Sequence, residues 1–231
     1  FPYTTLFRSI LDFSKIESGK LDLEQQLFGD GFATLAQAGI IVSLGHSDCD
    51  AATAQRAMQA GARCATHLFN AMSQMANRAP GLVGAVLDGD GHAGLIADAI
   101  HVDPVTLRVA LAAKATGLFL VSDCMALAGT DLTEIQLGGR RILRQGGRLT
   151  LEDGTLAGAD LTLPRAVQII VQEVGLPLDQ ALRMVTTTPA KLLGRLSDLG
   201  QFQPGMPADM VHLDENLQLA AVWRAGERLA A

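Results

Sequence analysis

Apolar and polar residues follow one repeating pattern over residues 39–123. An apolar run ends in a polar residue, and a helix-like segment comes next. Buried parallel strands read as continuous apolar runs rather than as alternating ones, so each run is predicted to be a strand. The predicted strands are 40–45, 62–66, 92–100 and 118–122, and the polar residues that end them are His46, His67, His101 and Asp123.

The segments between these runs carry helix signals. Ser47 and Asp48 are both able to cap the stretch AATAQRAMQA, which ends at Gly61. Asp103-Pro104 predicts a cap followed by proline in the first helical turn, opening VTLRVALAAKATG. The pattern therefore predicts successive strand–helix units, typical of an α/β protein.

The four polar residues lie 21, 34 and 22 positions apart, as expected of such units. In a (β/α)8 barrel the C-terminal ends of the strands converge on one mouth, where the chemistry takes place. Three histidines and one aspartate on a common rim would form a metal hydrolase site. The periodicity by itself equally allows an open, doubly wound sheet.

Beyond Asp123 the pattern changes. Residues 134–154 read as β-hairpins, 163–174 and 178–185 as helices, Thr188-Pro189 as the start of a short helix, and 208–226 as paired strands. We therefore expect an accessory sheet that the chain visits twice. The predicted division is a foreign N-terminal segment over 1–29, a partial barrel over 30–130 and 155–198, and β-sandwich segments over 131–154 and 199–231.

Composition narrows the class of protein. The chain has 231 residues, of which 48% are apolar, enough for one large domain or one domain with a partial neighbour. A net charge of −6 without basic clusters argues against nucleic-acid binding. Three cysteines without a CxxC pair predict a reduced, cytoplasmic setting. No apolar stretch has the length of a membrane span, so no membrane partner is expected.

The N-terminal part carries an unrelated signal. Residues Ile10 to Gln26 resemble the end of a histidine-kinase dimerisation helix. Neither the phosphoacceptor histidine nor an ATP-binding domain accompanies this segment. A two-component signalling fragment is therefore kept only as an alternative of another class.

Several motifs together resemble one enzyme family. They are GHSD at 45–48, THLFNAMS at 66–73, RAPGLVGA at 78–85, LIADAIHV at 95–102, LVSDCMALAG at 120–129, GTLAGADLTL at 154–163 and the closing PGMPADMVHLD. From about Leu35 onward the chain resembles the N-acetylglucosamine-6-phosphate deacetylases of the amidohydrolase superfamily. The resemblance implies a (β/α)8 metal-dependent hydrolase barrel with a small β-sandwich, usually in a homodimer.

The resemblance also assigns roles by position. His46 and His67 match metal-binding imidazoles, with zinc or iron as the divalent ion, and Asp123 matches the catalytic carboxylate. The residues that match substrate contacts are Asn70, Ala71, Arg78, His101, Leu156, Ala157 and Gly158. The implied reaction is hydrolysis of an amino-sugar phosphate acetamide by metal-activated water, with Asp123 as general base and then acid.

Some features depart from the family pattern. Ala79 stands where glutamate is usual, and Ala99 stands where glycine is usual, which we expect to be a mild change. The family's metal-binding glutamate, a further histidine and about four strands precede the matched region, so we expect poor metal binding and low activity from this polypeptide alone. An amidohydrolase acting on another amide, or an inactive fragment, remain alternatives.

Other polar residues are predicted to be structural. His92 and His212 lie away from the strand ends that carry the motifs. Asp48 and Asp50 are better explained as helix caps than as ligands. Asp98 either supports the strand or supports His101. Arg140, Arg141, Arg144 and Arg148 predict a solvated basic face.

Overall fold

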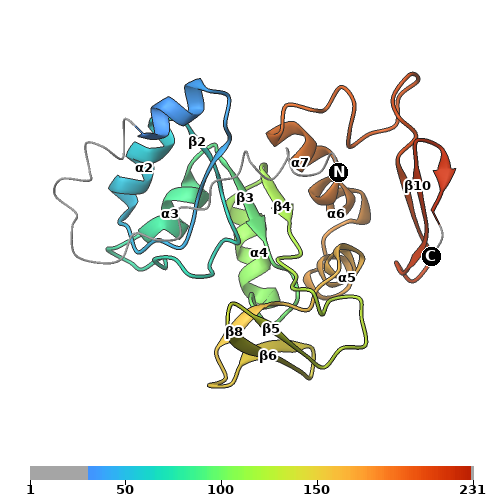
Figure 1. Ribbon diagram of the computed structural model, residues 1–231. Coiled ribbons are helices and arrows are strands. Elements are labelled where there is room, and N and C mark those ends of the chain that lie inside the picture. The colour runs from blue at the N-terminus through green and yellow to red at the C-terminus, as the bar shows by residue number, and fades with distance from the viewer. Residues whose placement is uncertain (1–30, 230–231) are drawn as a thin grey trace. The chain divides into compact units, whose positions relative to one another are not determined.

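The computed structural model describes residues 31–229 (Figure 1). The predicted foreign segment 1–29, with its resemblance to a histidine kinase, lies outside these residues. Within 31–229 no helix is both long enough and apolar enough to cross a membrane. The chain forms two compact units, one made of 31–94 and Ala110–Leu118, the other of Leu95–Val109 and 119–229.

The first unit contains strand–helix repeats that match the sequence pattern. After a helix over 31–37, its main elements are β1 (Val42–Leu44), α2 (Ala51–Gln59), β2 (Ala62–Ala65), α3 (Gly81–Asp88) and most of β3 (His92–Leu95). The strand β2 pairs in parallel with both β1 and β3. Two further elements, α4 (Pro104–Ala113) and β4 (Leu118–Leu120), contain residues of both units, and the parallel sheet has the order β1-β2-β3-β4.

Local chemistry explains where the first helices begin. The side chain of Asp50, not that of Ser47 or Asp48, caps α2 by accepting a 2.7 Å hydrogen bond from Thr53 N. Helix α4 begins at Pro104, and Asp103 Oδ1 accepts a hydrogen bond from Val105 N, as predicted from Asp103-Pro104. Helix α3 is buried over almost its whole length because its sequence, GLVGAVLD, is apolar on every side.

The strands are shorter than the apolar runs. The run over 92–100 forms a strand only from His92 to Leu95, although Ile96 and Ala97 are fully buried. Beyond them the carboxylate of Asp98 accepts the backbone N–H groups of Ile100 and His101, which turns the chain. Apolar character therefore marks burial here, and it does not mark the length of the strand.

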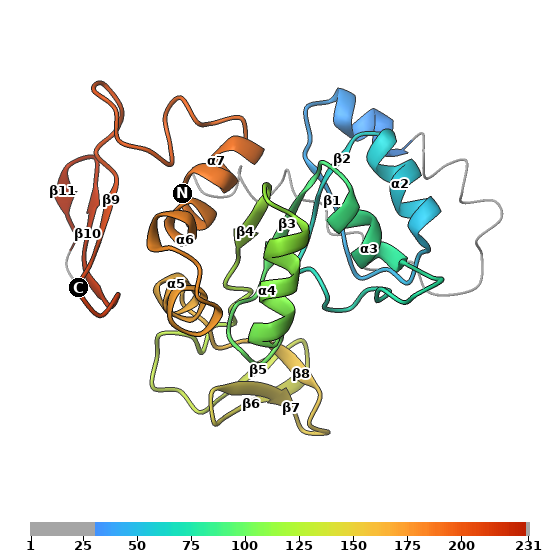
Figure 2. The same ribbon diagram turned by 180° about the vertical axis from the view of Figure 1, so that it is seen from behind.

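The second unit contains two antiparallel sheets and a group of helices. One sheet has the order β5-β6-β7-β8 and the other has the order β11-β10-β9, the latter seen from behind in Figure 2. Their strands are β5 (Glu134–Leu137), β6 (Arg140–Gln145), β7 (Arg148–Leu151), β8 (Leu156–Ala159), β9 (Met210–Leu213), β10 (Leu219–Arg224) and β11 (Glu227–Arg228). The expectation of one accessory sheet visited twice was wrong, because each group of strands pairs only within itself in the described residues.

The helices of this unit follow the sequence prediction closely. They are α5 (Leu163–Ile169), its π-helical continuation η3 (Ile170–Val174), α6 (Leu178–Val185) and α7 (Thr187–Leu192). Thr162 caps α5 by accepting a hydrogen bond from Arg165 N, and Gly175 ends η3 in a left-handed conformation. The buried residues Ala166, Val167, Ile169 and Ile170 form part of the core.

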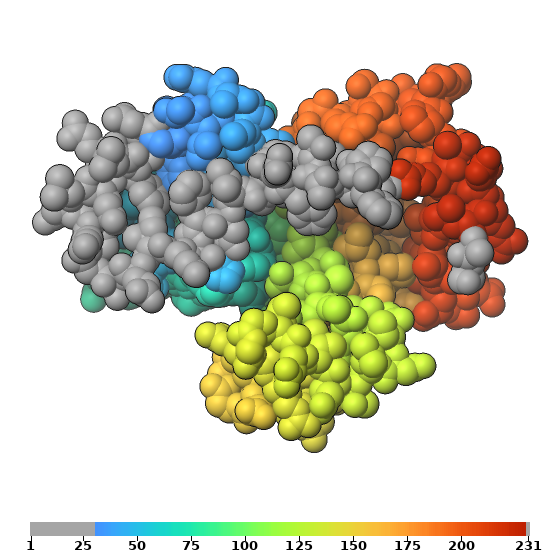
Figure 3. Space-filling model, in the orientation of Figure 1, coloured from blue at the N-terminus to red at the C-terminus, as the bar shows by residue number. Residues whose placement is uncertain are grey.

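The antiparallel sheet β5-β6-β7-β8 has a small core of its own, and its segment is yellow in Figures 1 and 3. Leu127, Ile142 and Leu149 are buried together there. Arg144 is partly buried, and its Nη2 donates to the carbonyl of Leu127 and, at 2.8 Å, to Asp160 Oδ1. The predicted solvated basic face is therefore wrong for Arg144, whose guanidinium ties the preceding loop to the sheet, while Arg140, Arg141 and Arg148 are exposed.

Candidate active site

The ends of β1 and β2 approach each other closely. Thr66 N donates a 2.8 Å hydrogen bond to Leu44 O, and a Cβ atom at Gly45 would lie 2.1 Å from Thr66 Cγ2. Only glycine fits at this position, because a side chain there would overlap the neighbouring strand. The missing side chain lets the two strand ends deliver the residues that follow them to one place.

His46 and His67 are those residues, and their imidazole rings meet. The two Nε2 atoms lie 2.8 Å apart, and the rings are in an edge-on arrangement with centroids separated by 4.6 Å. His67 is buried, whereas His46 is exposed. His46 has a backbone φ of 46°, a left-handed conformation that side chains rarely adopt and that occurs preferentially at functional sites. Two of the predicted metal ligands are thus brought together.

Backbone and hydroxyl contacts hold the loops that follow these histidines against each other. Ser73 N donates to Ser47 O at 3.1 Å, and Ser73 Oγ donates to Cys49 O at 2.5 Å. The same hydroxyl accepts a 2.8 Å hydrogen bond from Leu82 N in the first turn of α3. Ser73 therefore links the His46 loop, the His67 loop and α3, and sequence reasoning did not identify it.

Asn70 and Ala71 lie in the loop directly after His67. The Asn70 side-chain amide donates to the carbonyls of His67 and Leu68, both at 3.3 Å, so its Oδ1 is left for another donor. Ala71 has a φ of 49° and is exposed. Arg78 lies farther along, exposed in the loop before α3. These three predicted substrate contacts therefore belong to the same unit as the histidine pair.

His101 belongs to the second unit and has a different partner. Its Nδ1 lies 2.6 Å from Asp98 Oδ2, and both side chains are almost fully buried. Burial raises the pKa of the Asp98 carboxyl, but hydrogen bonds from the His101 ring and from the N–H groups of Ile100 and His101 lower it, so this pKa lies below its usual value. Asp98 is therefore a carboxylate, and of the two roles kept open for it the structure shows a direct contact with His101.

Asp123 lies three residues beyond β4, and its main chain is tied to β8. Ala159 N donates to Asp123 O at 3.0 Å, and Met125 N donates to Ala159 O at 3.3 Å. Asp123 has a φ of 45°, and its side chain is exposed. A Cβ atom at Gly158 would lie 2.8 Å from Met125 Cγ and 3.4 Å from Asp123 O. Gly158, one of the three residues of the predicted pocket wall, therefore lies next to the main chain of Asp123, the predicted catalytic residue.

Comparisons with known proteins agree on one family. The model of the amidohydrolase family matches residues 32–229. The chain belongs to the amidohydrolase family. It is 41% identical over 197 residues to the N-acetylgalactosamine-6-phosphate deacetylase of Shewanella sp. (strain ANA-3), covering 84% of this chain and 50% of that protein. It is 37% identical to the N-acetylglucosamine-6-phosphate deacetylase of Haemophilus influenzae, covering 79% and 49%.

Solved structures of this family share the fold. The N-acetylglucosamine-6-phosphate deacetylase of Pasteurella multocida has a TM-score of 0.86 and 34% identity, covering 95% of this chain and 63% of the other. A D267A mutant of the Mycobacterium smegmatis enzyme, in complex with N-acetyl-D-glucosamine-6-phosphate, has a TM-score of 0.80 and 32% identity, covering 87% and 54%. This chain thus has a partial amidohydrolase barrel, and it spans about half the length of the curated relatives that it matches.

Amidohydrolases depend on a metal ion, and the histidine pair fits part of such a site. Two imidazole nitrogens that converge on one point are suitable donors for zinc or iron. Within residues 31–229 no group of three or more His, Cys, Asp or Glu side chains is placed to hold a metal. The buried His67 Nδ1 also has no hydrogen-bond partner there. The meeting of His46, His67, His101 and Asp123 at one mouth stays a prediction.

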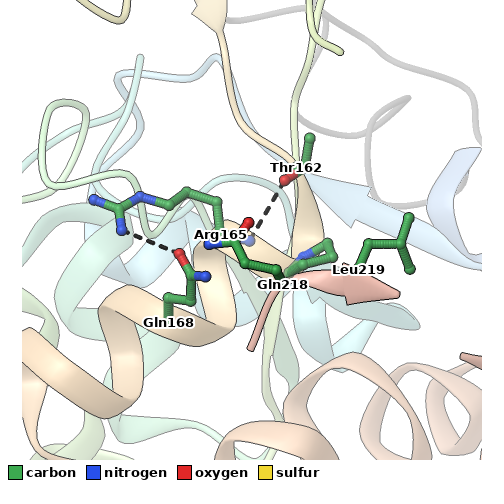
Figure 4. A pocket seen from close by; sticks show the side chains of 6 residues that line it. Thr162, Arg165, Gln168, Gln218 and Leu219 are labelled. Carbon is green, nitrogen blue, oxygen red and sulfur yellow. Dashed lines mark hydrogen bonds between the residues drawn. The ribbon is translucent and has the colours of Figure 1, made fainter. Parts of the chain in front are cut away.

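A cavity in the second unit has no predicted site residue in its wall. It has a volume of about 420 Å³ and is lined by Thr162, Pro164, Arg165, Gln168, Gln218 and Leu219 (Figure 4). Arg165 Nη1 donates to Gln168 Oε1 at 3.1 Å, and Gln168 Nε2 donates to Asn216 O at 2.9 Å. The buried amide is therefore satisfied within the protein, and it connects α5 to the turn before β10.

Sequence reasoning missed two features close to the predicted site residues. The linking role of Ser73 left no signal beyond a small hydroxyl residue at the end of THLFNAMS. Ala99 has a φ of 61°, in the left-handed region, so the replacement of the usual glycine is less mild than expected. A glycine that recurs in a family motif is the signal that could have indicated this conformation.

Proposed function

We propose that this chain supplies part of the active site of a metal-dependent deacetylase, which converts N-acetylglucosamine 6-phosphate into glucosamine 6-phosphate and acetate. The observation that carries the proposal is the convergence of His46 Nε2 and His67 Nε2 at 2.8 Å at the ends of neighbouring parallel strands. It occurs in a chain whose relatives at 37–41% identity bear the names of deacetylases for phosphorylated amino sugars.

His46 and His67 would hold a divalent ion, zinc or iron, through their Nε2 atoms. When bound, such an ion polarises the acetamide carbonyl and lowers the pKa of a coordinated water. The approach of β1 to β2 at Gly45 and the hydrogen bonds of Ser73 hold the two imidazoles in place. The two donors are therefore brought together before any ligand arrives, which favours binding.

Asp123 would act on the proton of the attacking water. Its carboxylate takes that proton while the water oxygen bonds to the acetyl carbon, and then returns it to the sugar nitrogen as the carbon–nitrogen bond breaks. Amide cleavage needs this second transfer because a neutral amine leaves far more readily than its anion. The hydrogen bonds between Asp123, Met125 and Ala159 orient the carboxylate through the main chain.

The remaining predicted residues would bind the sugar phosphate. Arg78 offers an exposed guanidinium whose geometry suits a phosphate group. Asn70 offers Oδ1 as an acceptor for a hydroxyl or amide N–H group, since its amide hydrogens point to two carbonyls. Ala71 and His101 would add contacts, and Leu156, Ala157 and Gly158 would form a wall of the pocket.

The proposal extends to the surroundings of the enzyme. The cysteines Cys49, Cys64 and Cys124 are all free thiols, which suits the reduced cytoplasm. We include assembly as a homodimer, as the family resemblance implies. The isomer of the sugar is part of the test, because the Shewanella relative is named for N-acetylgalactosamine 6-phosphate.

Acetate release tests this function directly. The purified chain is incubated with zinc or ferrous ion and with N-acetylglucosamine 6-phosphate, its galactosamine isomer, or N-acetylglucosamine without phosphate. Because this chain spans about half the length of its relatives, we expect acetate release to be slow. It should come from a phosphorylated sugar only, and its rate should fall about a hundredfold or more in Asp123→Asn. No acetate from either phosphorylated sugar, or release that Asp123→Asn leaves unchanged, would contradict the proposal.

A further inference from the structure

A hydrogen-bonded pair of buried side chains follows β3. Asp98 Oδ2 lies 2.6 Å from His101 Nδ1, and the exposed fractions of the two side chains are only 7% and 8%. We infer that Asp98 is a positioning residue, which holds His101 through Nδ1 and leaves Nε2 as the ring atom that meets the phosphorylated amino sugar. This inference rests on the proposed function in its statement about the substrate.

The two oxygens of Asp98 have separate tasks. Oδ1 accepts backbone N–H groups from Ile100 at 2.8 Å and from His101 at 2.7 Å. Oδ2 is left for the imidazole. The same carboxylate therefore shapes the turn that carries His101 and fixes the angle of its ring, so neither the backbone nor the side chain of His101 rotates freely.

An ionised carboxylate accepts hydrogen bonds and donates none. The ring nitrogen facing Asp98 must therefore carry a proton, which places the hydrogen of neutral His101 on Nδ1. Nε2 is then an acceptor in the neutral ring and a donor in the protonated ring. Both states are useful toward a sugar phosphate, which offers hydroxyl and amide donors as well as anionic oxygens.

The substitution Asp98→Asn would reverse this arrangement without changing the size of the side chain. Two backbone N–H groups point at Oδ1, so the oxygen of the amide must stay at that position. The amide nitrogen then takes the place of Oδ2 and donates to His101 Nδ1. A nitrogen that accepts this bond carries no proton, so the neutral ring is locked with its hydrogen on Nε2.

The protonation of each ring nitrogen is measured by long-range proton–nitrogen correlation NMR of the full chain labelled with nitrogen-15 in histidine. The chain has five histidines, and the loss of one set of signals in His101→Gln assigns His101. We expect the proton on Nδ1 in the wild-type neutral ring and on Nε2 in Asp98→Asn. A wild-type ring with its proton on Nε2, or a variant ring that keeps it on Nδ1, would overturn the inference.

Asp103→Asn is the matched control. Asp103 Oδ1 accepts the N–H of Val105 in a similar turn. Among the described residues the hydrogen bonds of His101 go to Asp98 and not to this exposed carboxylate. The control should leave the signals of His101 unchanged. A shift of the proton in Asp103→Asn as well would show that the effect is general and would count against a specific role for Asp98.

Titration with N-acetylglucosamine 6-phosphate tests the substrate half of the inference. We expect the Nε2 signal of His101 to move more than the Nδ1 signal, and the affinity of Asp98→Asn to fall about tenfold or more. Unchanged affinity in a variant with the reversed proton would refute the positioning role. A wild-type chain that binds no amino-sugar phosphate would instead refute the proposed function and the substrate half together, while the NMR spectra still decide the proton position.

Discussion

His46 and His67 direct their Nε2 atoms to within 2.8 Å of each other from the ends of neighbouring parallel strands. An exposed histidine and a buried one meet in this way only when the backbone holds them close together. Here the backbone does so through the short distance between β1 and β2 at Gly45 and through the left-handed conformation of His46. The pair is the centre of the candidate metal site.

Removing either ring should weaken metal binding. We expect His46→Ala and His67→Ala each to lower the affinity for zinc by at least about tenfold, because each variant loses one of two converging donors. Isothermal titration calorimetry at one fixed pH measures the affinity. His212→Ala serves as the control, since His212 lies in β9 beside Trp223. Equal affinities for all three variants would show that zinc binds elsewhere.

A side chain added at Gly45 should disturb the close approach of β1 to β2. In Gly45→Ala the new methyl group would lie 2.1 Å from Thr66 Cγ2, so the strand ends must separate. We expect this variant to lose about 1–3 kcal/mol of stability in urea unfolding and to bind zinc more weakly. Thr66→Ser removes Cγ2, and the next Thr66 atom would be 3.4 Å away. Gly45→Ala/Thr66→Ser should therefore recover most of both losses, and a double variant as poor as Gly45→Ala would refute this explanation.

Replacing Ala99 by glycine should stabilise the folded chain. Its φ of 61° costs an L-residue about 1–2 kcal/mol, whereas glycine adds about 0.4–1 kcal/mol of unfolded-state entropy. We expect Ala99→Gly to raise the free energy of unfolding by about 0.5–1 kcal/mol. In Ala97→Gly, at a fully buried position with no positive φ, the same change should destabilise the chain. Urea midpoints that fall for both variants would contradict the strain at Ala99.

Alkaline pH should lower the stability of the folded chain by ionising Cys64 in β2. Burial raises the pKa of this thiol from 9.0 to about 11, against the lowering effect of a hydrogen bond with Ser43. The Cys64 thiol therefore keeps its proton to a higher pH in the folded chain than in the unfolded chain. Its stabilising contribution is complete below pH 9 and is lost between pH 9 and about 11. We expect a loss of about 2 kcal/mol over this window in addition to that from other groups.

Cys64→Ala isolates this contribution, because all other titrating groups remain. Urea unfolding of both proteins at pH 8 and pH 10.5 should show a smaller loss in the variant. Parallel losses in the two proteins would mean that the Cys64 thiol ionises as easily in the folded chain as in the unfolded one.

The strand–helix repeats could be predicted because local signals and burial agree there. The cap and proline at Asp103-Pro104 and the apolar run before His67 each indicate one structure, and the structure confirms them. Strand lengths could not be predicted, because Ile96 and Ala97 are apolar and buried whether or not they pair. The accessory sheets were merged in the prediction, because strand periodicity does not record which strand is the neighbour.

The sequence by itself determined the residue types of the site, since only a few side chains bind metals or move protons, and their motifs are local in the chain. It also determined that His46 and His67 follow predicted strands. Only the tertiary structure decided that Gly45 and Thr66 leave no room between those strands, that Asp98 divides its oxygens between backbone and imidazole, and that Ala99 is strained. These features depend on distances and backbone angles between residues, and a linear pattern of polar and apolar positions contains neither.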